Sequence, residues 1–96
     1  MGGGILLNRI PLNVGRVAVS LAGRDEGRPM VVVAEIDEDF VLVADGDLRK
    51  LAKPKKKRRK HLKATKDQFE LMPGGKPAKD HQIREALSQG TPKEEG

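Results

Sequence analysis

The sequence predicts a small, mainly β domain with a basic extension and a short C-terminal helix. Apolar and other residues alternate from residue 17 to residue 21, a mostly β-branched run follows at 30–36, and a second apolar run lies at 40–44, which is typical of strands. A block at 49–66 holds eleven Lys or Arg residues and no Asp or Glu. A chain of 96 residues has room for one small core.

The first predicted strand begins near Val14. Its two faces carry Val17, Val19 and Leu21 on one side and Arg16, Ala18 and Ser20 on the other. This period of two indicates a strand with one buried face, and it places Arg16 outside. Residues 22–29 are rich in turn formers, so we expect a hairpin loop there.

Residues 30–36 and 40–44 are separated only by the acidic residues 37–39, which predicts a second hairpin. Both runs are apolar at nearly every position, and Phe40 is expected in the core. We therefore expect both faces to be covered, one by the interior and the other by an apolar N-terminal arm or a C-terminal element.

The segment after residue 44 is harder to assign. Residues 45–47 form a turn signal, and Pro54 indicates an edge or a loop within the basic block. Leu62, Phe69 and the apolar pair 71–72 indicate a final short strand or a packed extension.

Residues 73–77 are typical of a linker, and a short helix is predicted after it. Asp80, Ile83, Ala86 and Leu87 have helical spacing, with Asp80 as a candidate N-cap and Gly90 as a C-terminal stop. Because so short a helix is marginal alone, it must dock or fray.

The positive charge of the chain is local. The block at 49–66 contains eleven of the nineteen basic residues, which leaves eight basic residues against fourteen acidic ones elsewhere. Such a block repels itself unless anions neutralise it, and nucleic acid is the commonest dense polyanion in a cell. A solvated, disordered run and a nuclear-import signal are the alternatives.

Several function classes are disfavoured. The chain has no Cys, so disulfides and cysteine-ligated zinc are excluded. No catalytic arrangement survives a check of residue spacing: neither histidine has an evident nucleophile or metal partner, and the glycines at 23 and 27 lack the ending of a phosphate-binding loop. We therefore expect no enzyme, no cofactor and no small-molecule substrate. No apolar run approaches the roughly 20 residues that span a bilayer, so we expect no membrane partner and an intracellular protein.

Residues 14–33, VGRVAVSLAGRDEGRPMVVV, resemble the KOW motif, in which glycines close a loop between two strands. Together with residues 36–46 and the basic stretch, the chain resembles bacterial KOW-domain proteins related to archaeal and eukaryotic large-subunit ribosomal proteins. The resemblance covers about 14–62. It implies an SH3-like barrel of about five strands that binds structured RNA, with ribosomal RNA and the cytoplasmic large subunit as partners. KOW barrels also occur as protein-interaction modules of transcription elongation complexes, which is the alternative.

The chain then divides into an arm at 1–12, a barrel at 13–66 with its basic segment at 49–66, a linker at 67–78, a helix at 79–90 and a disordered tail at 91–96. We expect one positive rim to contact RNA phosphates. Its candidate residues are Arg16, Arg24, Arg28, Arg49, Lys50, Lys53, Lys55, Lys56, Lys57, Arg58, Arg59, Lys60, His61 and Lys63. For Arg24 and Arg28, pairing with Asp25 and Glu26 is an equal alternative. Only two residues are aromatic, so we expect no base-stacking platform of the RNA-recognition-motif or oligonucleotide-binding-fold type, and recognition should rest on phosphates, sugars and RNA shape.

Overall fold

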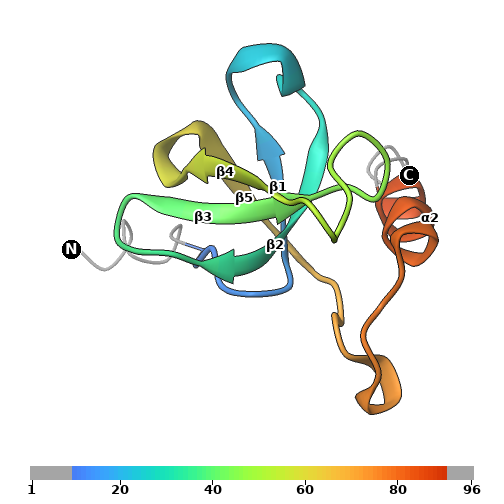
Figure 1. The fold of residues 1–96 in the computed structure, drawn as a ribbon. Coiled ribbons are helices and arrows are strands. Elements are labelled where there is room, and N and C mark those ends of the chain that lie inside the picture. Colours follow the sequence, from blue (N-terminus) through green and yellow to red (C-terminus); the bar gives the residue numbers. More distant parts are fainter. Residues whose placement is uncertain (1–9, 91–96) are drawn as a thin grey trace.

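The computed structural model describes residues 10–90 as five strands, three single 3₁₀ turns and one α-helix (Figure 1). The strands are β1 (Arg16–Ser20), β2 (Pro29–Glu35), β3 (Phe40–Ala44), β4 (Lys55–Arg58) and β5 (Leu62–Gln68). The turns are η1 (Gly23–Asp25), η2 (Arg59–His61) and η3 (Pro73–Gly75), and the helix is α2 (Asp80–Gly90). The predicted tail at 91–96 and most of the predicted arm at 1–12 lie outside the described residues.

The strands form one antiparallel sheet in the order β4-β3-β2-β1-β5. In a flat sheet the outer strands would be about 19 Å apart, at about 4.8 Å per strand. Yet only η2 joins β4 to β5, and the chain from Arg58 to Leu62 spans at most about 14 Å. The sheet must therefore curl, and the predicted mainly β, barrel-like fold is confirmed.

The barrel interior is a compact apolar cluster. Its buried members are Ala18, Met30, Val32, Val41, Val43 and Leu62, with Leu12 packed against them. Leu12 thus brings the end of the predicted arm onto the barrel, as expected.

The prediction of the buried face of β1 was wrong. Ala18 and Ser20 are the buried residues of this strand, whereas Leu21 just beyond it is 49% exposed. β1 lies between β2 and β5, and Ala18 on its inner face packs in the interior cluster. Val17 instead packs in a second cluster on the outside of the sheet.

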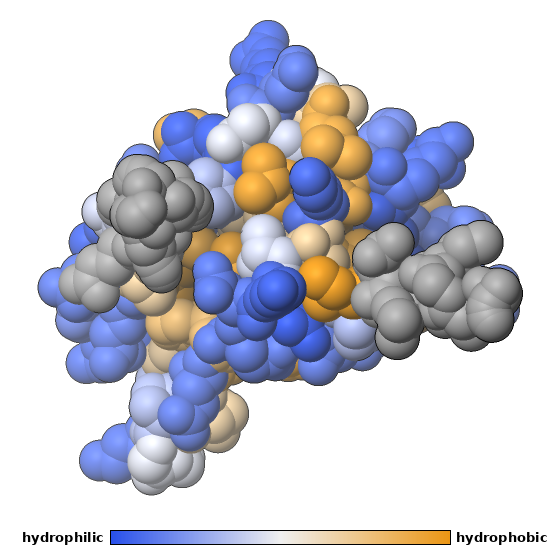
Figure 2. All heavy atoms as spheres, turned by 180° about the vertical axis from the view of Figure 1, so that it is seen from behind, coloured by the Kyte–Doolittle hydropathy of each residue, from blue (hydrophilic) through white to orange (hydrophobic). Residues whose placement is uncertain are grey.

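Helix α2 covers part of the outer face of the sheet, so the expectation of a covering C-terminal element is confirmed. Ile83 and Leu87 pack with Val31 of β2, and Val17 and Phe69 are among the residues around them. Figure 2 shows apolar side chains gathered toward the middle of the rear face, with hydrophilic side chains around them.

The helix begins differently from the prediction. Asp80 is its first residue and not its N-cap, since the backbone N–H groups of Gln82 and Ile83 donate to the carbonyl oxygen of Lys79. The Asp80 carboxylate instead accepts a hydrogen bond from the backbone N–H of Leu51 at 2.8 Å. Lys79 precedes the helix, and its N–H donates to Gln82 Oε1 at 2.7 Å. Arg84 donates to the carbonyl oxygen of Gly46 at 2.6 Å. The contacts of Asp80 and Arg84 attach the N-terminal half of α2 to the 45–51 loop.

Within residues 10–90, none of the helical segments is both long and apolar enough to cross a membrane.

Candidate nucleic-acid interface

The basic segment is partly built into the sheet. Pro54 is followed at once by β4, which is the outer strand of the sheet and is hydrogen-bonded to β3. Side chains alternate across a strand, so neighbours in the lysine run face opposite ways. The side chain of Lys57 is 8% exposed, whereas Lys56 and Arg58 are exposed. Pairing in β4 therefore sorts the run into inward and outward cations.

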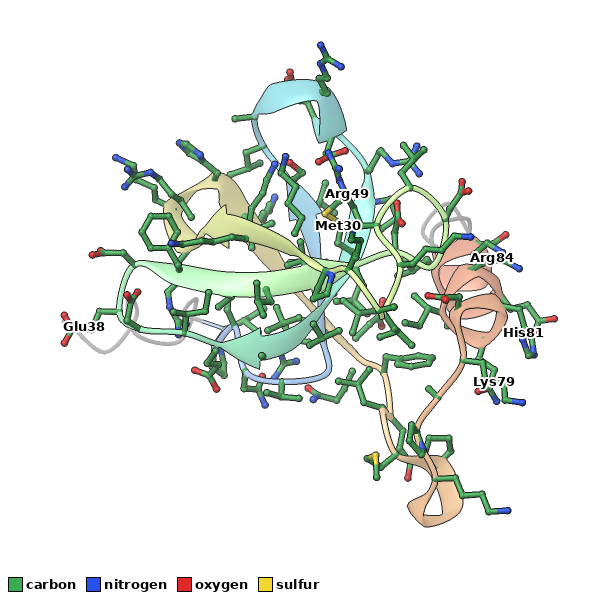
Figure 3. All side chains as sticks on the ribbon, in the orientation of Figure 1. Met30, Glu38, Arg49, Lys79, His81 and Arg84 are labelled. Atoms are coloured by element: carbon green, nitrogen blue, oxygen red, sulfur yellow. The ribbon has the colours of Figure 1, made fainter. Side chains whose placement is uncertain are left out.

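The inward cations hold a buried carboxylate. Asp25, in η1, is 2% exposed, and its Oδ2 lies 3.5 Å from Arg49 Nη2 and 3.8 Å from Lys57 Nζ. Lys57 Nζ also donates to the carbonyl oxygen of Ala22 at 3.2 Å. The side chain of Arg49 is half-buried, and the view of Figure 3 shows it in front of or behind the region of the buried Met30. Arg49 and Lys57 thus join η1 to β4 and the loop before it.

Arg28 has different acidic partners from the two considered in the sequence. Its Nη2 lies 2.9 Å from Asp45 Oδ2 and 3.8 Å from Asp47 Oδ2, while Asp25 pairs with Arg49 and Lys57. The hydrogen bond to Asp45 raises the pKa of Arg28. Arg28 therefore braces the 45–47 turn against β2.

Asp45 organises that turn. Its Oδ1 accepts hydrogen bonds from the backbone N–H groups of Asp47 at 2.9 Å and Arg49 at 2.8 Å. Burial opposes ionisation of Asp45, but these two hydrogen bonds and the one from Arg28 outweigh it, so the pKa of Asp45 is lowered.

This lowered pKa predicts acid sensitivity. The ionised Asp45 contributes stability that is present above its unfolded pKa, about 3.9, and is lost as the pH falls through its lower folded value. We expect the free energy of unfolding to fall below about pH 5, and to fall less steeply in Asp45→Asn, which is less stable at neutral pH. Urea unfolding followed by circular dichroism between pH 6 and 2 measures this. Asp67→Asn, at an exposed position, is the control. Parallel profiles for wild type and Asp45→Asn would contradict the role given to Asp45.

Arg16 and Arg59 also make intramolecular contacts. Arg16 Nε donates to the carbonyl oxygen of Pro11 at 2.9 Å, and its Nη1 reaches that of Thr65 at 3.4 Å. Arg59 Nη2 lies 3.1 Å from Glu35 Oε1, and its Nε donates to the carbonyl oxygen of Asp37 at 2.9 Å. Arg16 therefore connects β5 with the residues that precede β1. Arg59 connects η2 with the β2–β3 hairpin.

The other predicted contact residues make no ion pair within residues 10–90. Seven are exposed and two, Lys55 and His61, are half-buried. The exposed residues are Arg24, Lys50, Lys53, Lys56, Arg58, Lys60 and Lys63. We call these seven the outward cations.

Most outward cations belong to elements that meet at one end of the barrel. Lys57 joins β4 to η1, and the N–H of Leu21 donates to the carbonyl oxygen of His61 at 2.8 Å, which joins η2 to the end of β1. Arg16 is at the opposite end of β1, so the structure does not bring it to this rim. The positive rim therefore consists of η1, β4 and η2 with their flanking residues.

Phe40 is not a core residue, contrary to expectation. It is half-buried and belongs to neither apolar cluster among the described residues. Lys56 Nζ lies 4.4 Å and Arg58 Cζ 5.0 Å from the centroid of its ring. The sequence gives no signal for this arrangement, because it depends on the pairing of β3 with β4.

Comparison with known proteins identifies the family. No family model matches the chain. Large ribosomal subunit protein eL14 of Desulfurococcus amylolyticus is 32% identical over 78 residues, which cover 81% of this chain and 78% of the relative. The protein of the same name from Metallosphaera sedula is 33% identical with the same coverage, and that of Hyperthermus butylicus is 30% identical over 81% of this chain and 76% of its own length. The resemblance to KOW-type large-subunit ribosomal proteins is thus confirmed, and the chain belongs to the eL14 family of large ribosomal subunit proteins.

Proposed function

We propose that the protein is a structural component of the large ribosomal subunit that binds ribosomal RNA through the outward cations of its positive rim. Membership of the eL14 family supports the assignment of the protein to the large ribosomal subunit. It also supports a non-enzymatic role in the cytoplasm, where that subunit works. The observation that carries the RNA contact is the sorting of charge by β4, which leaves Lys56 and Arg58 outward and without a carboxylate partner among residues 10–90.

The alternatives receive less support. The relatives reported above are ribosomal and not transcription factors. The candidate import signal at 53–60 includes a strand whose Lys57 is buried against Asp25, so it is not a freely accessible extended peptide.

Salt dependence tests the proposal. Each neutralised phosphate releases condensed counterions, so the logarithm of affinity should fall by about 0.7 to 0.9 per contact for each unit of log salt. We expect four or five contacts, and hence a slope of about −3 to −4.5, for fluorescent large-subunit RNA fragments titrated between 50 and 200 mM salt. A slope near zero would contradict a phosphate-based interface.

A further inference from the structure

The outer face of β3 and β4 carries an aromatic ring flanked by two cations. Phe40 begins β3 and is paired directly with Arg58, while Lys56 is paired with Leu42, two residues along β3. Partners in this register place their side chains on the same face. The register therefore explains why both cations reach the Phe40 ring at 4.4 and 5.0 Å.

These two cations differ from their sequence neighbours. Lys57 contacts the buried Asp25, and Arg59 is paired with Glu35. Lys56 and Arg58 are exposed, and within residues 10–90 neither makes an ion pair. Their charges remain available to an external anion.

The carboxylate of Asp37, whose charge interacts with that of Lys56, is engaged elsewhere. The Oδ1 of Asp37 accepts hydrogen bonds from the backbone N–H groups of Asp39 and Phe40, both at 2.8 Å. These bonds are the main reason why the pKa of Asp37 is lowered, and the charges of Lys56 and Arg59 contribute less. Asp37 is thus directed into its own hairpin turn.

The chemistry of this trio suits a nucleotide. A guanidinium group held over a ring keeps its edge donors free for a phosphate and offers its own plane for stacking. An ammonium group beside it adds a point charge for the phosphate. An unpaired base stacks on such a surface whatever its sequence, because every base has a π-face.

We propose that Phe40, Lys56 and Arg58 form a subsite for one unpaired nucleotide of RNA, with its phosphate bound by the two cations and its base stacked on the Arg58–Phe40 pair. This inference rests on the proposed RNA-binding function and adds that the rim binds a loop or bulge, where bases are free to stack. A continuous duplex offers the site phosphates but no unstacked base.

The two phenylalanines provide the first test. The whole 96-residue chain, labelled with ¹³C in its Phe rings, is titrated with an RNA hairpin that has an unpaired adenine loop and with a fully paired duplex of equal length. We expect the Phe40 ring resonances to shift with the hairpin and to stay nearly fixed with the duplex. Phe69, packed in the cluster under α2, is the internal control. Equal Phe40 shifts with both RNAs, or none with either, would overturn the subsite.

Two variants provide the second test. Phe40→Leu removes the ring, and Arg58→Lys keeps the charge but removes the planar group. Each should weaken binding of the hairpin about tenfold while leaving duplex affinity and the salt slope unchanged. Arg58→Lys changes an exposed side chain, so it stays informative if Phe40→Leu disturbs folding.

The outcomes separate this subsite from the proposed function. Steep salt dependence of wild-type binding, together with wild-type hairpin affinity in both variants, would refute the subsite and leave phosphate binding by the rim intact. Salt-independent binding of both RNAs by the wild type would refute both.

Discussion

Replacing Lys53, Lys56 and Lys60 together by glutamine is expected to weaken binding to large-subunit RNA about a hundredfold near 150 mM salt. Each of these exposed lysines is proposed to neutralise one phosphate, so the salt slope should also become less steep by about two to three. None of the three makes an intramolecular ion pair within residues 10–90, so the free energy of unfolding should fall by at most about 1 kcal/mol, from the lost contact of Lys56 with the Phe40 ring. Fluorescence anisotropy with labelled RNA at several salt concentrations measures both effects.

A matched triple variant separates position from net charge. Lys66, Lys76 and Lys79 are also exposed, but they lie in β5, beside η3 and just before α2. Figure 3 shows Lys79 near the start of the helix, away from β4. Their replacement by glutamine removes the same charge and should change affinity much less. Equal losses in the two triple variants would show that binding depends on total charge and not on the rim.

Lys57 gives a second contrast within the same strand. Lys57→Met is expected to leave the salt slope unchanged, because this ammonium group contacts Asp25 and the Ala22 carbonyl oxygen. The substitution should instead lower the free energy of unfolding, since the buried Asp25 then keeps only Arg49 as a cationic partner.

Gly46→Ala is expected to destabilise the protein by about 3 to 5 kcal/mol, a large part of the stability of a small domain. Gly46 has a φ of 80°, where any other residue is strained, and an added Cβ would collide with the carbonyl oxygen of Asp80. The start of α2 would have to move away. That movement would break the hydrogen bonds of Leu51 and Arg84 and loosen the packing of Ile83 on Val31.

Gly27→Ala is the control for this substitution. Gly27 has a φ of 85°, but nothing lies within 4 Å of the position of an added Cβ. It should cost only the backbone strain, about 1 to 2 kcal/mol. Urea unfolding gives the two stabilities, and hydrogen exchange of residues 80–88 shows whether the helix has undocked. Equal destabilisation by the two substitutions would contradict the tight contact between Gly46 and α2.

Local sequence patterns predicted much of the fold. The apolar runs at 30–36 and 40–44 correspond to β2 and β3, and the acidic residues between them form the hairpin turn. The helical spacing after Asp80 corresponds to α2, which docks as a short helix must. These elements depend on periodicity and turn chemistry, which can be read along the chain.

The site was less predictable because it depends on pairing between distant residues. In the sequence every cation of residues 55–60 looks equivalent, and only the pairing of β4 with β3 decides that Lys57 faces inward. Arg28 and Asp45, which form an ion pair, are seventeen residues apart in the sequence. The ion pair of Asp25 with Arg49 forms only because η1 folds over the end of the barrel. Phe40 was predicted to be a core residue because the sequence does not show that it begins β3 and lies on the outer face of the sheet.

Ultraviolet crosslinking in native cells, with sequencing of the attached RNA and a sucrose gradient run in parallel, tests the central claim most directly. The account predicts crosslinks clustered at one ribosomal RNA locus and comigration of the protein with large subunits. Crosslinks scattered over nascent transcripts, or a protein confined to the light fractions without crosslinks, would contradict it.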